Sequence, residues 1–171
     1  MKKTNKLVLV LQYILAVGLL TGLDQWTKYL AVTHLKGQED IPLIPGALYL
    51  HYLENRGAAF GMFQNQRVFF IIMTLLVLGA VFFVLWKMPS DRRFLWLKGV
   101  CFLISAGAIG NFADRVRLNY VVDFIYFSPI NFPVFNVADI YVVISTALFL
   151  LLFLFYYKDE DFNFLKRGGR G

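Results

Sequence analysis

Cysteine, histidine and charged residues are scarce in this chain, and each scarcity excludes a class of protein. The single cysteine, Cys101, cannot form an internal disulfide and has no second thiol for a cysteine metal site. The two histidines, His34 and His51, stand apart from any cluster of acids or thiols. The motifs H-E-x-x-H and G-x-S-x-G are both absent. Metalloprotease and Ser-His chemistry are therefore disfavoured.

The low charge content also excludes a water-soluble globule. Charged residues make up 16% and hydrophobic residues 58% of the 171 residues, against roughly 25% and 45–50% in soluble proteins. Aromatic residues, at 18%, exclude a disordered chain. The net charge of +6 is better explained by membrane orientation than by nucleic acid, and we expect no nucleic-acid partner.

Four apolar stretches are long enough to cross a bilayer, for which a helix needs about 17 to 25 residues. They cover residues 7–23, 68–86, 94–113 and 140–157. The sequence thus predicts an α-helical polytopic membrane protein with four transmembrane helices in a single membrane domain, residues 1–171. A cleavable signal peptide is the alternative for the first stretch, but no small-residue cleavage site follows it.

The basic residues indicate the orientation of these helices. Eleven belong to the two ends and the second connection, and six to the first and third connections. By the positive-inside rule both termini are cytoplasmic, and the connections 24–67 and 114–139 lie outside. The C-terminal residues 158–171 are expected to form a flexible cytoplasmic tail.

The long first connection is predicted to contain a small β and amphipathic element. Residues 47–53 are rich in β-favouring aromatics between Gly46 and the segment Asn55-Arg56-Gly57. We expect a short strand or hairpin there. The apolar stretch 58–63 should follow it in the membrane interface.

Nine polar residues within or beside the four spans fall on the predicted outer side. Ionisable groups at membrane depth are costly and are functional candidates by default. They are Asp24, Lys28, Asn55, Asn111, Asp114, Arg115, Asp123, Asn136 and Asp139.

Several of these residues also have a purely structural interpretation. Asp24 and Lys28 have the spacing of a helical ion pair, and Asp114 and Arg115 could pair with each other. Cys101 is read as a small core residue. The small residues next to Asn111 favour close helix packing as their explanation: Ala106, Gly107, Ala108 and Gly110.

Asp139 and Asp123 are the strongest catalytic candidates, although Asp139 has a structural alternative. Asn136 and Asp139 have the spacing of a capping box at the start of the fourth span. Asp123 stands in a β-branched and aromatic run, where a buried carboxylate is costly. The intervening residues 124–138 contain two prolines and must double back, which can bring the acids together. Two adjacent carboxylates share one proton and can hydrolyse an amide without a cofactor.

The motifs of this chain resemble those of lipoprotein signal peptidase (signal peptidase II), a family of bacterial aspartyl membrane proteases. The likeness extends over nearly the whole length, and one departure is Ala106, where the family usually has a second glycine. The matching blocks, in order, are Asp24-Gln25-Trp26-Thr27-Lys28, Glu54-Asn55-Arg56-Gly57-Ala58-Ala59-Phe60-Gly61, 106–115, Val121-Val122-Asp123-Phe124-Ile125 and Phe135-Asn136-Val137-Ala138-Asp139.

The resemblance implies an aspartic endopeptidase whose catalytic residues are Asp123 and Asp139, with no metal and no cofactor. It also implies a set of residues that bind substrate or support the site. These are Asp24, Lys28, Asn55, Gly57, Asn111, Asp114, Arg115, Asn136 and Ala138.

The resemblance further implies the substrate and the location. The family removes the signal peptide from prolipoproteins, on the amino side of a lipobox cysteine that carries diacylglycerol, at the outer surface of the bacterial cytoplasmic (inner) membrane. It implies membrane lipids as partners and globomycin-type cyclic peptides as inhibitors, and we expect a monomer. The alternatives from other classes are a small channel or transporter and a non-catalytic membrane adaptor.

Overall fold

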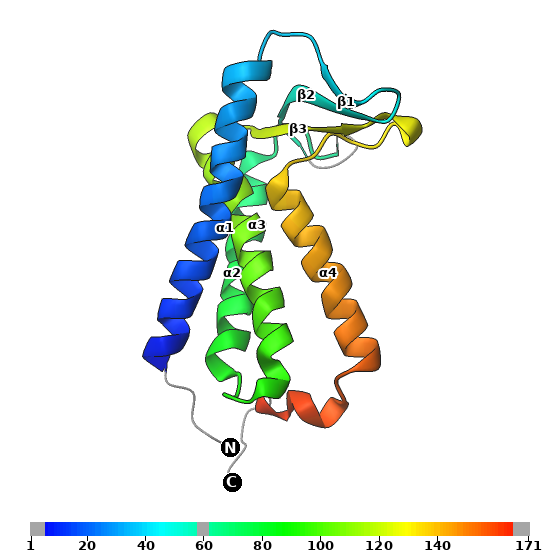
Figure 1. Cartoon of the computed structure of the whole chain (residues 1–171). Coiled ribbons are helices and arrows are strands. Elements are labelled where there is room, and N and C mark those ends of the chain that lie inside the picture. The colour runs from blue at the N-terminus through cyan, green and yellow to red at the C-terminus, as the bar shows by residue number, and fades with distance from the viewer. Residues whose placement is uncertain (1–5, 58–61, 166–171) are drawn as a thin grey trace.

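The computed structural model describes residues 6–57 and 62–165, and its main body is a bundle of four long helices (Figure 1). In the described residues, four helices are long and apolar enough to cross a membrane, so the predicted helical architecture is confirmed. The helices are α1 (Lys6–Leu35), α2 (Arg67–Lys87), α3 (Leu95–Leu118) and α4 (Val137–Phe155).

Helix α1 extends well beyond the predicted end of its span at residue 23. At 1.5 Å per residue it is about 45 Å long, more than a bilayer core requires. Asp24 and Lys28, which interrupt the apolar run, are buried against the protein and so do not end the helix. The helix ends before Gly37, whose positive φ of 75° suits a glycine in a turn.

Helices α3 and α4 also differ from their predicted bounds, at the ends that face the sheet. Helix α3 continues past residue 113 to Leu118 and ends where Asn119 adopts a left-handed conformation, φ 68°. Helix α4 begins at Val137 instead of residue 140, because Asn136 caps it in the predicted capping box.

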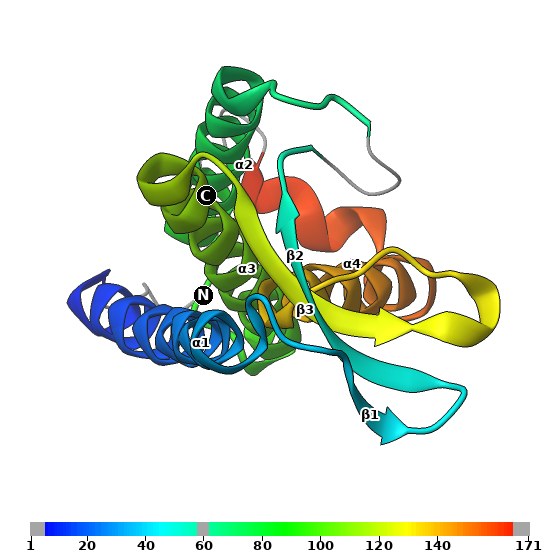
Figure 2. The same cartoon turned by 90° about the horizontal axis from the view of Figure 1, so that it is seen from above.

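A three-stranded antiparallel sheet, β1-β2-β3, lies across one end of the bundle. Strands β1 (Ile41–Ile44) and β2 (Leu48–Asn55) form the predicted hairpin, which turns at Gly46. Strand β3 (Val121–Phe127) pairs with β2 in a register that sets Leu53 opposite Asp123. The sequence did not predict this pairing, which joins segments far apart in the chain. Seen from above, β1 projects beyond the helices (Figure 2).

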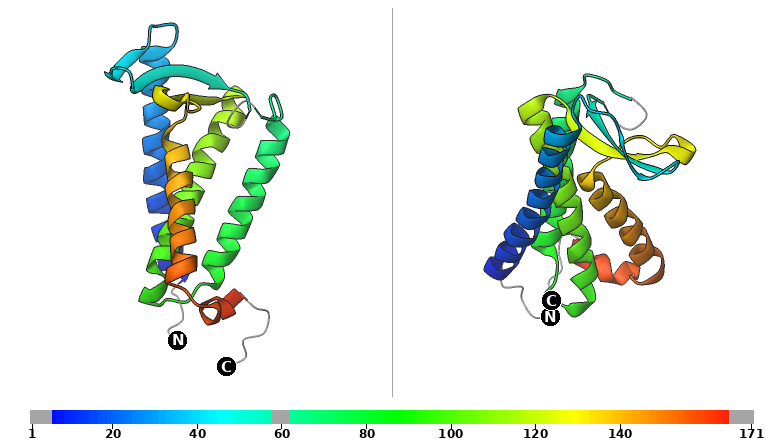
Figure 3. Two further views of the ribbon diagram at one scale, coloured as in Figure 1. Left: turned by 90° about the vertical axis from the view of Figure 1, so that its right-hand side faces the viewer. Right: turned by 45° about the horizontal axis from the view of Figure 1, so that its top comes forward.

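The sheet is fixed to the bundle through the C-terminal part of α1 (Figure 3). Val122 and Phe124 of β3 form a buried apolar cluster with Ala31 and Leu35 of α1. Since successive side chains of a strand point to opposite faces, Asp123 points away from this cluster. The packing of β3 on α1 thus decides the direction of Asp123.

Helix α3 stands at the centre of the bundle and contacts each of the other three helices. The short 3-10 helix η2 (Arg92–Phe94) precedes it, and η3 (Ser128–Ile130) follows β3. The described ends of the chain, α1 at Lys6 and the 3-10 helix η4 (Asp159–Leu165), lie at the end of the bundle opposite the sheet (Figure 1).

The prediction of a flexible tail over 158–171 is wrong for its first half. Residues 159–165 form η4, which packs on the bundle. Asp161 accepts a hydrogen bond of 2.6 Å from Arg93, and Phe94 stacks on Tyr157 with ring centroids 5.8 Å apart. The sequence reading missed the aromatic and acidic residues that make these contacts. Residues 166–171 lie outside the described part of the chain, as do residues 58–61 of the predicted amphipathic stretch.

Candidate active site

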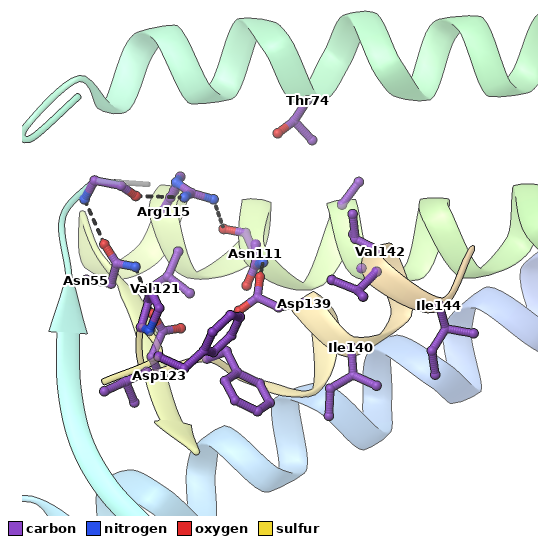
Figure 4. A pocket seen from close by; sticks show the side chains of 18 residues that line it. Asn55, Thr74, Asn111, Arg115, Val121, Asp123, Asp139, Ile140, Val142 and Ile144 are labelled. Carbon is purple, nitrogen blue, oxygen red and sulfur yellow. Dashed lines mark hydrogen bonds between the residues drawn. The ribbon is translucent and has the colours of Figure 1, made fainter. Parts of the chain in front are cut away.

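A pocket of about 600 Å³ opens between α2, α3 and α4, beneath β2 and β3 (Figure 4). It is the place where the two predicted catalytic residues meet, because both Asp123 and Asp139 line it. Its remaining wall is mostly apolar. That wall includes Ala108, Phe132, Pro133, Val134, Phe135, Ile140, Val142, Val143 and Ile144.

Asp123 projects from β3 and is 2% exposed. Asn136 donates a hydrogen bond of 2.6 Å to its Oδ1, and Asn55 donates one of 2.7 Å to its Oδ2. Burial, followed by the charge of Asp139, raises the pKa of Asp123 from its ordinary value to about 7, against the lowering effect of the two asparagines. Asp123 is therefore a carboxyl group that can hold a proton near neutral pH.

Asp139 lies in the first turn of α4, beside the same asparagine. Asn111 donates a hydrogen bond of 2.8 Å to its Oδ1, and the backbone N–H of Asn136 donates one of 3.1 Å to its Oδ2. Asn136 Oδ1 accepts the N–H of Asp139 at 3.0 Å, which completes the capping box. Asn136 thus contacts both acids, one through its side-chain amide and the other through its backbone.

Lys28 of α1 is the centre of a buried ionic network behind the two acids. Its ammonium lies 3.0 Å from Asp24 Oδ2 and 3.0 Å from Asp114 Oδ2, and it donates a hydrogen bond of 2.9 Å to Asn111 Oδ1. All three charged residues are at most 3% exposed. The predicted Asp24–Lys28 ion pair is confirmed, and it is part of a larger network.

This network orients the amide of Asn111 towards Asp139. The Oδ1 atom of Asn111 accepts from both Lys28 and Asn136, so its Nδ2 remains to donate to Asp139. An ammonium can only donate, which excludes the flipped amide. A chain of hydrogen bonds therefore runs from α1 through α3 to the acid on α4.

Asp24 also fixes the start of α4. Its Oδ1 accepts the backbone N–H of Ala138 at 2.9 Å, and Ala138 is fully buried. A Cβ atom at Gly107 would lie 2.5 Å from the carbonyl oxygen of Ala138, and one at Gly110 would meet the Asp24 carboxylate. The predicted close packing by these glycines is thus confirmed, and it brings α4 and Asp24 against α3.

Asp114 and Arg115 do not form the ion pair with each other that the sequence allowed. Asp114 pairs with Lys28 and accepts the N–H of Val122 at 3.2 Å, which ties β3 to α3. The Arg115 guanidinium lies 4.4 Å from the ring centroid of Phe70 and donates to the carbonyl of Gly57 at 3.3 Å. Arg115 therefore joins α3, α2 and the segment after β2 at the pocket wall.

Two polar residues at the site were missed from the sequence. Gln25 donates to Asp24 Oδ2, Asp114 Oδ1 and the Gly110 carbonyl, at 3.0 to 3.2 Å. Gln25 lies within one of the sequence blocks that resemble the family, and this position could have identified it as a site residue. Thr74 of α2 lines the pocket, and its position in an apolar run gave no signal.

The two histidines and the cysteine lie away from the pocket. His34 and His51 do not line it, and Cys101 is a buried core residue, as predicted. Over residues 6–57 and 62–165, no group of three or more His, Cys, Asp or Glu side chains could hold a metal ion. The polar side chains that line the pocket are two carboxylates, two asparagines, a threonine and a guanidinium.

Comparison with known proteins gives one family over most of the chain. The family model Peptidase_A8, described as signal peptidase (SPase) II, matches residues 16–155. The lipoprotein signal peptidase of Streptococcus thermophilus is 47% identical over 146 residues, covering 85% of this chain and 92% of that protein. The lipoprotein signal peptidase of Streptococcus pyogenes serotype M1 is 40% identical, covering 88% of this chain and 96% of that protein.

The fold has solved counterparts as well. A bacterial membrane enzyme determined by the in meso method at 2.3 Å resolution superposes with a TM-score of 0.77, at 34% identity, over 84% of this chain and 87% of that chain. A second, at 1.9 Å, gives 0.75 at 33% identity, over 85% and 94% of the two chains. Since the family model covers most of the chain and the relatives are similar over nearly their full length, this protein belongs to the signal peptidase II family.

Proposed function

We propose that this protein is an aspartyl endopeptidase that removes the signal peptide from diacylglyceryl-modified prolipoproteins, cutting on the amino side of the lipidated cysteine. The observation that carries the proposal is the pair Asp123 and Asp139, which line one buried pocket and share Asn136 as a hydrogen-bonding partner. Such a pair in a low-dielectric site shares a proton, and this chemistry needs no metal ion or cofactor.

The pair divides into a base and an acid. The ionised carboxylate takes a proton from a water molecule, which attacks the scissile carbonyl carbon. The protonated carboxyl group donates to the carbonyl oxygen. As the C–N bond breaks, the carboxyl group that took the proton from water passes it to the leaving amine. Because burial and the charge of Asp139 raise the pKa of Asp123 to about 7, Asp123 can hold the shared proton at neutral pH.

The surrounding residues hold this pair in position. Asn55 and Asn136 orient the Asp123 carboxylate, and Asn111 orients that of Asp139. The network of Asp24, Lys28 and Asp114 in turn supports Asn111 and the start of α4. Arg115 and the backbone of Gly57 border the pocket, where an extended peptide would contact them.

The apolar walls of the pocket support a lipidated substrate. A signal peptide crosses the membrane as a helix, and its diacylglyceryl group also prefers the bilayer. The pocket combines two acids with aliphatic side chains of α4 further along the helix, including Val142, Val143 and Ile144 (Figure 4). Each buried CH₂ group contributes roughly 0.8 kcal/mol, so the acyl chains can hold the substrate beside the acids.

We further propose that the protein resides in the bacterial cytoplasmic (inner) membrane with both termini in the cytoplasm. The division of basic residues, eleven to six, supports this orientation, in which the sheet and the pocket face the outer surface. Globomycin-type cyclic peptides would bind in the same pocket, and the active form would be a monomer. The alternatives of a channel, a transporter or an adaptor find no support in the family assignment.

The test is cleavage of a diacylglyceryl-modified model substrate by the purified protein and its variants. Asp123→Asn and Asp139→Asn should each lower turnover by at least about 10²–10⁴-fold while the protein stays folded. Asp40→Asn is the matched control, because Asp40 pairs with His51 at an exposed site on the sheet. If Asp139 serves only as a helix cap, Asp139→Asn will lose stability and keep its activity, which would refute the assignment.

A further inference from the structure

Thr74 is the residue that α2 contributes to the pocket lining, and it is a polar residue in an otherwise apolar helix. Between the terminal residues Arg67 and Lys87, every other side chain of α2 is aliphatic, aromatic, methionine or glycine. Figure 4 shows Thr74 projecting from α2 towards the space in front of Asn111 and Asp139. It stands about two helical turns from the end of α2 near the sheet, and so at membrane depth.

The hydroxyl of Thr74 makes no hydrogen bond with any described residue. A threonine within a helix commonly bonds back to the carbonyl four residues earlier, as Thr33 does to Tyr29 at 2.8 Å. The other polar side chains of the pocket are hydrogen-bonded within the protein. These are Asn55, Asn111, Arg115, Asp123 and Asp139.

The substrate brings carbonyl groups that need a donor at this depth. An extended segment at a cleavage site exposes backbone carbonyls that a helix would satisfy internally, and the diacylglyceryl group adds two ester carbonyls. An unsatisfied polar group in hydrocarbon is costly. The other polar side chains of the described pocket lining already form hydrogen bonds within the protein. Thr74 is the hydrogen-bond donor that α2 offers to the pocket.

We propose that Thr74 is a substrate-binding residue whose hydroxyl donates a hydrogen bond to a carbonyl oxygen of the membrane-embedded part of the substrate. The acceptor is an ester carbonyl of the diacylglyceryl group or a backbone carbonyl of the signal peptide next to the cleavage site. This inference rests on the proposed function. It assigns to α2 a polar contact opposite the two acids.

The experiment compares Thr74→Val, which replaces the hydroxyl by a methyl group at nearly constant shape, with Thr74→Ser, which keeps it. The substrates are a diacyl ester lipopeptide and the same peptide with dialkyl ether chains, which lack the ester carbonyls. Loss of one neutral hydrogen bond should lower kcat/KM about threefold to tenfold on the ester substrate. Thr74→Ser should restore it.

The ether substrate identifies the acceptor. If the effect of Thr74→Val disappears on the ether substrate, the acceptor is the ester; if it persists, the acceptor is the peptide backbone. Equal kcat/KM for Thr74→Val and wild type on both substrates would overturn the proposal. So would a loss of activity that Thr74→Ser does not restore and that accompanies a lower thermal midpoint, since this indicates a structural role.

Two controls keep this result separate from the proposed function. Val77→Thr adds a hydroxyl at a partly exposed position of α2 that does not line the pocket, and should leave both substrates unaffected. If wild type cleaves neither substrate, or if Asp123→Asn cleaves them as wild type does, the proposed function fails. A failure confined to Thr74→Val leaves the proposed function intact.

Discussion

Replacing Lys28 by methionine tests whether the buried ionic network supports both the fold and the site. The ammonium lies 3.0 Å from each of the Asp24 and Asp114 carboxylates, and all three residues are almost completely buried. Removing one partner of a buried ion pair typically costs about 3–5 kcal/mol, because the remaining charge is left uncompensated. Here two carboxylates lose their partner, so the upper part of this range is expected.

The measurement is thermal unfolding of the purified protein in detergent, followed together with cleavage of the model substrate. For a chain of this size, 1 kcal/mol corresponds to a shift of about 2–4 °C in the unfolding midpoint, so Lys28→Met should unfold at least about 6 °C below wild type. Its turnover below that midpoint should fall by up to about 10²-fold, because the amide of Asn111 is no longer held towards Asp139.

Two further variants separate charge from shape. The double variant Lys28→Met with Asp114→Asn removes one uncompensated carboxylate and should recover part of the lost stability. Lys28→Arg keeps the charge but brings a planar guanidinium into a site that fits an ammonium, and should lie between wild type and Lys28→Met. A midpoint within 2 °C of wild type and normal turnover for Lys28→Met would refute the reasoning.

The remaining predictions concern pH, orientation and cofactors. Burial raises the pKa of Asp123 to about 7, so its protonated form stabilises the fold at low pH. The free energy of unfolding of wild type should therefore fall, relative to that of Asp123→Asn, as the pH rises from about 4 through 7. If the difference between the two free energies does not change with pH, the raised pKa is excluded. In a Cys101→Ala background, a cysteine at Gln38 should react with an impermeant thiol reagent from outside and one at Ser90 should not, and the reverse pattern would invert the topology. EDTA should leave activity unchanged, while the unlipidated precursor should be a poor substrate; inhibition that zinc reverses, or equal cleavage of both precursors, would contradict the mechanism.

The sequence by itself determined the helical architecture and the candidate residues. Apolar runs of sufficient length leave few alternatives to transmembrane helices, because a bilayer core demands that every backbone polar group be satisfied within the segment. The capping box at Asn136 and Asp139 could be predicted as well, since it depends on residues three positions apart. The ion pair of Asp24 and Lys28 is equally local.

The long-range contacts could not be obtained in this way. The pairing of β3 with β2, the helix bounds near Asp24 and Asp114, and the docking of η4 through Asp161 each depend on partners distant in the chain. A charged residue ends an apolar run in the sequence, but it does not end a helix when the fold supplies an opposite charge.

Tertiary structure also decided what the polar residues do together. Local spacing predicts that Lys28 pairs with Asp24 and that Asn136 caps a helix, and the family resemblance adds only that both support the site. The structure connects Lys28 to Asn111 and Asn111 to Asp139, and it gives Asn136 a contact with each of the two acids. The physical reason is that hydrogen bonds are directional and short, so a network forms only when packing brings its members within about 3 Å. Here the glycines at 107 and 110 allow that approach, and the packing of β3 on α1 turns Asp123 towards the pocket.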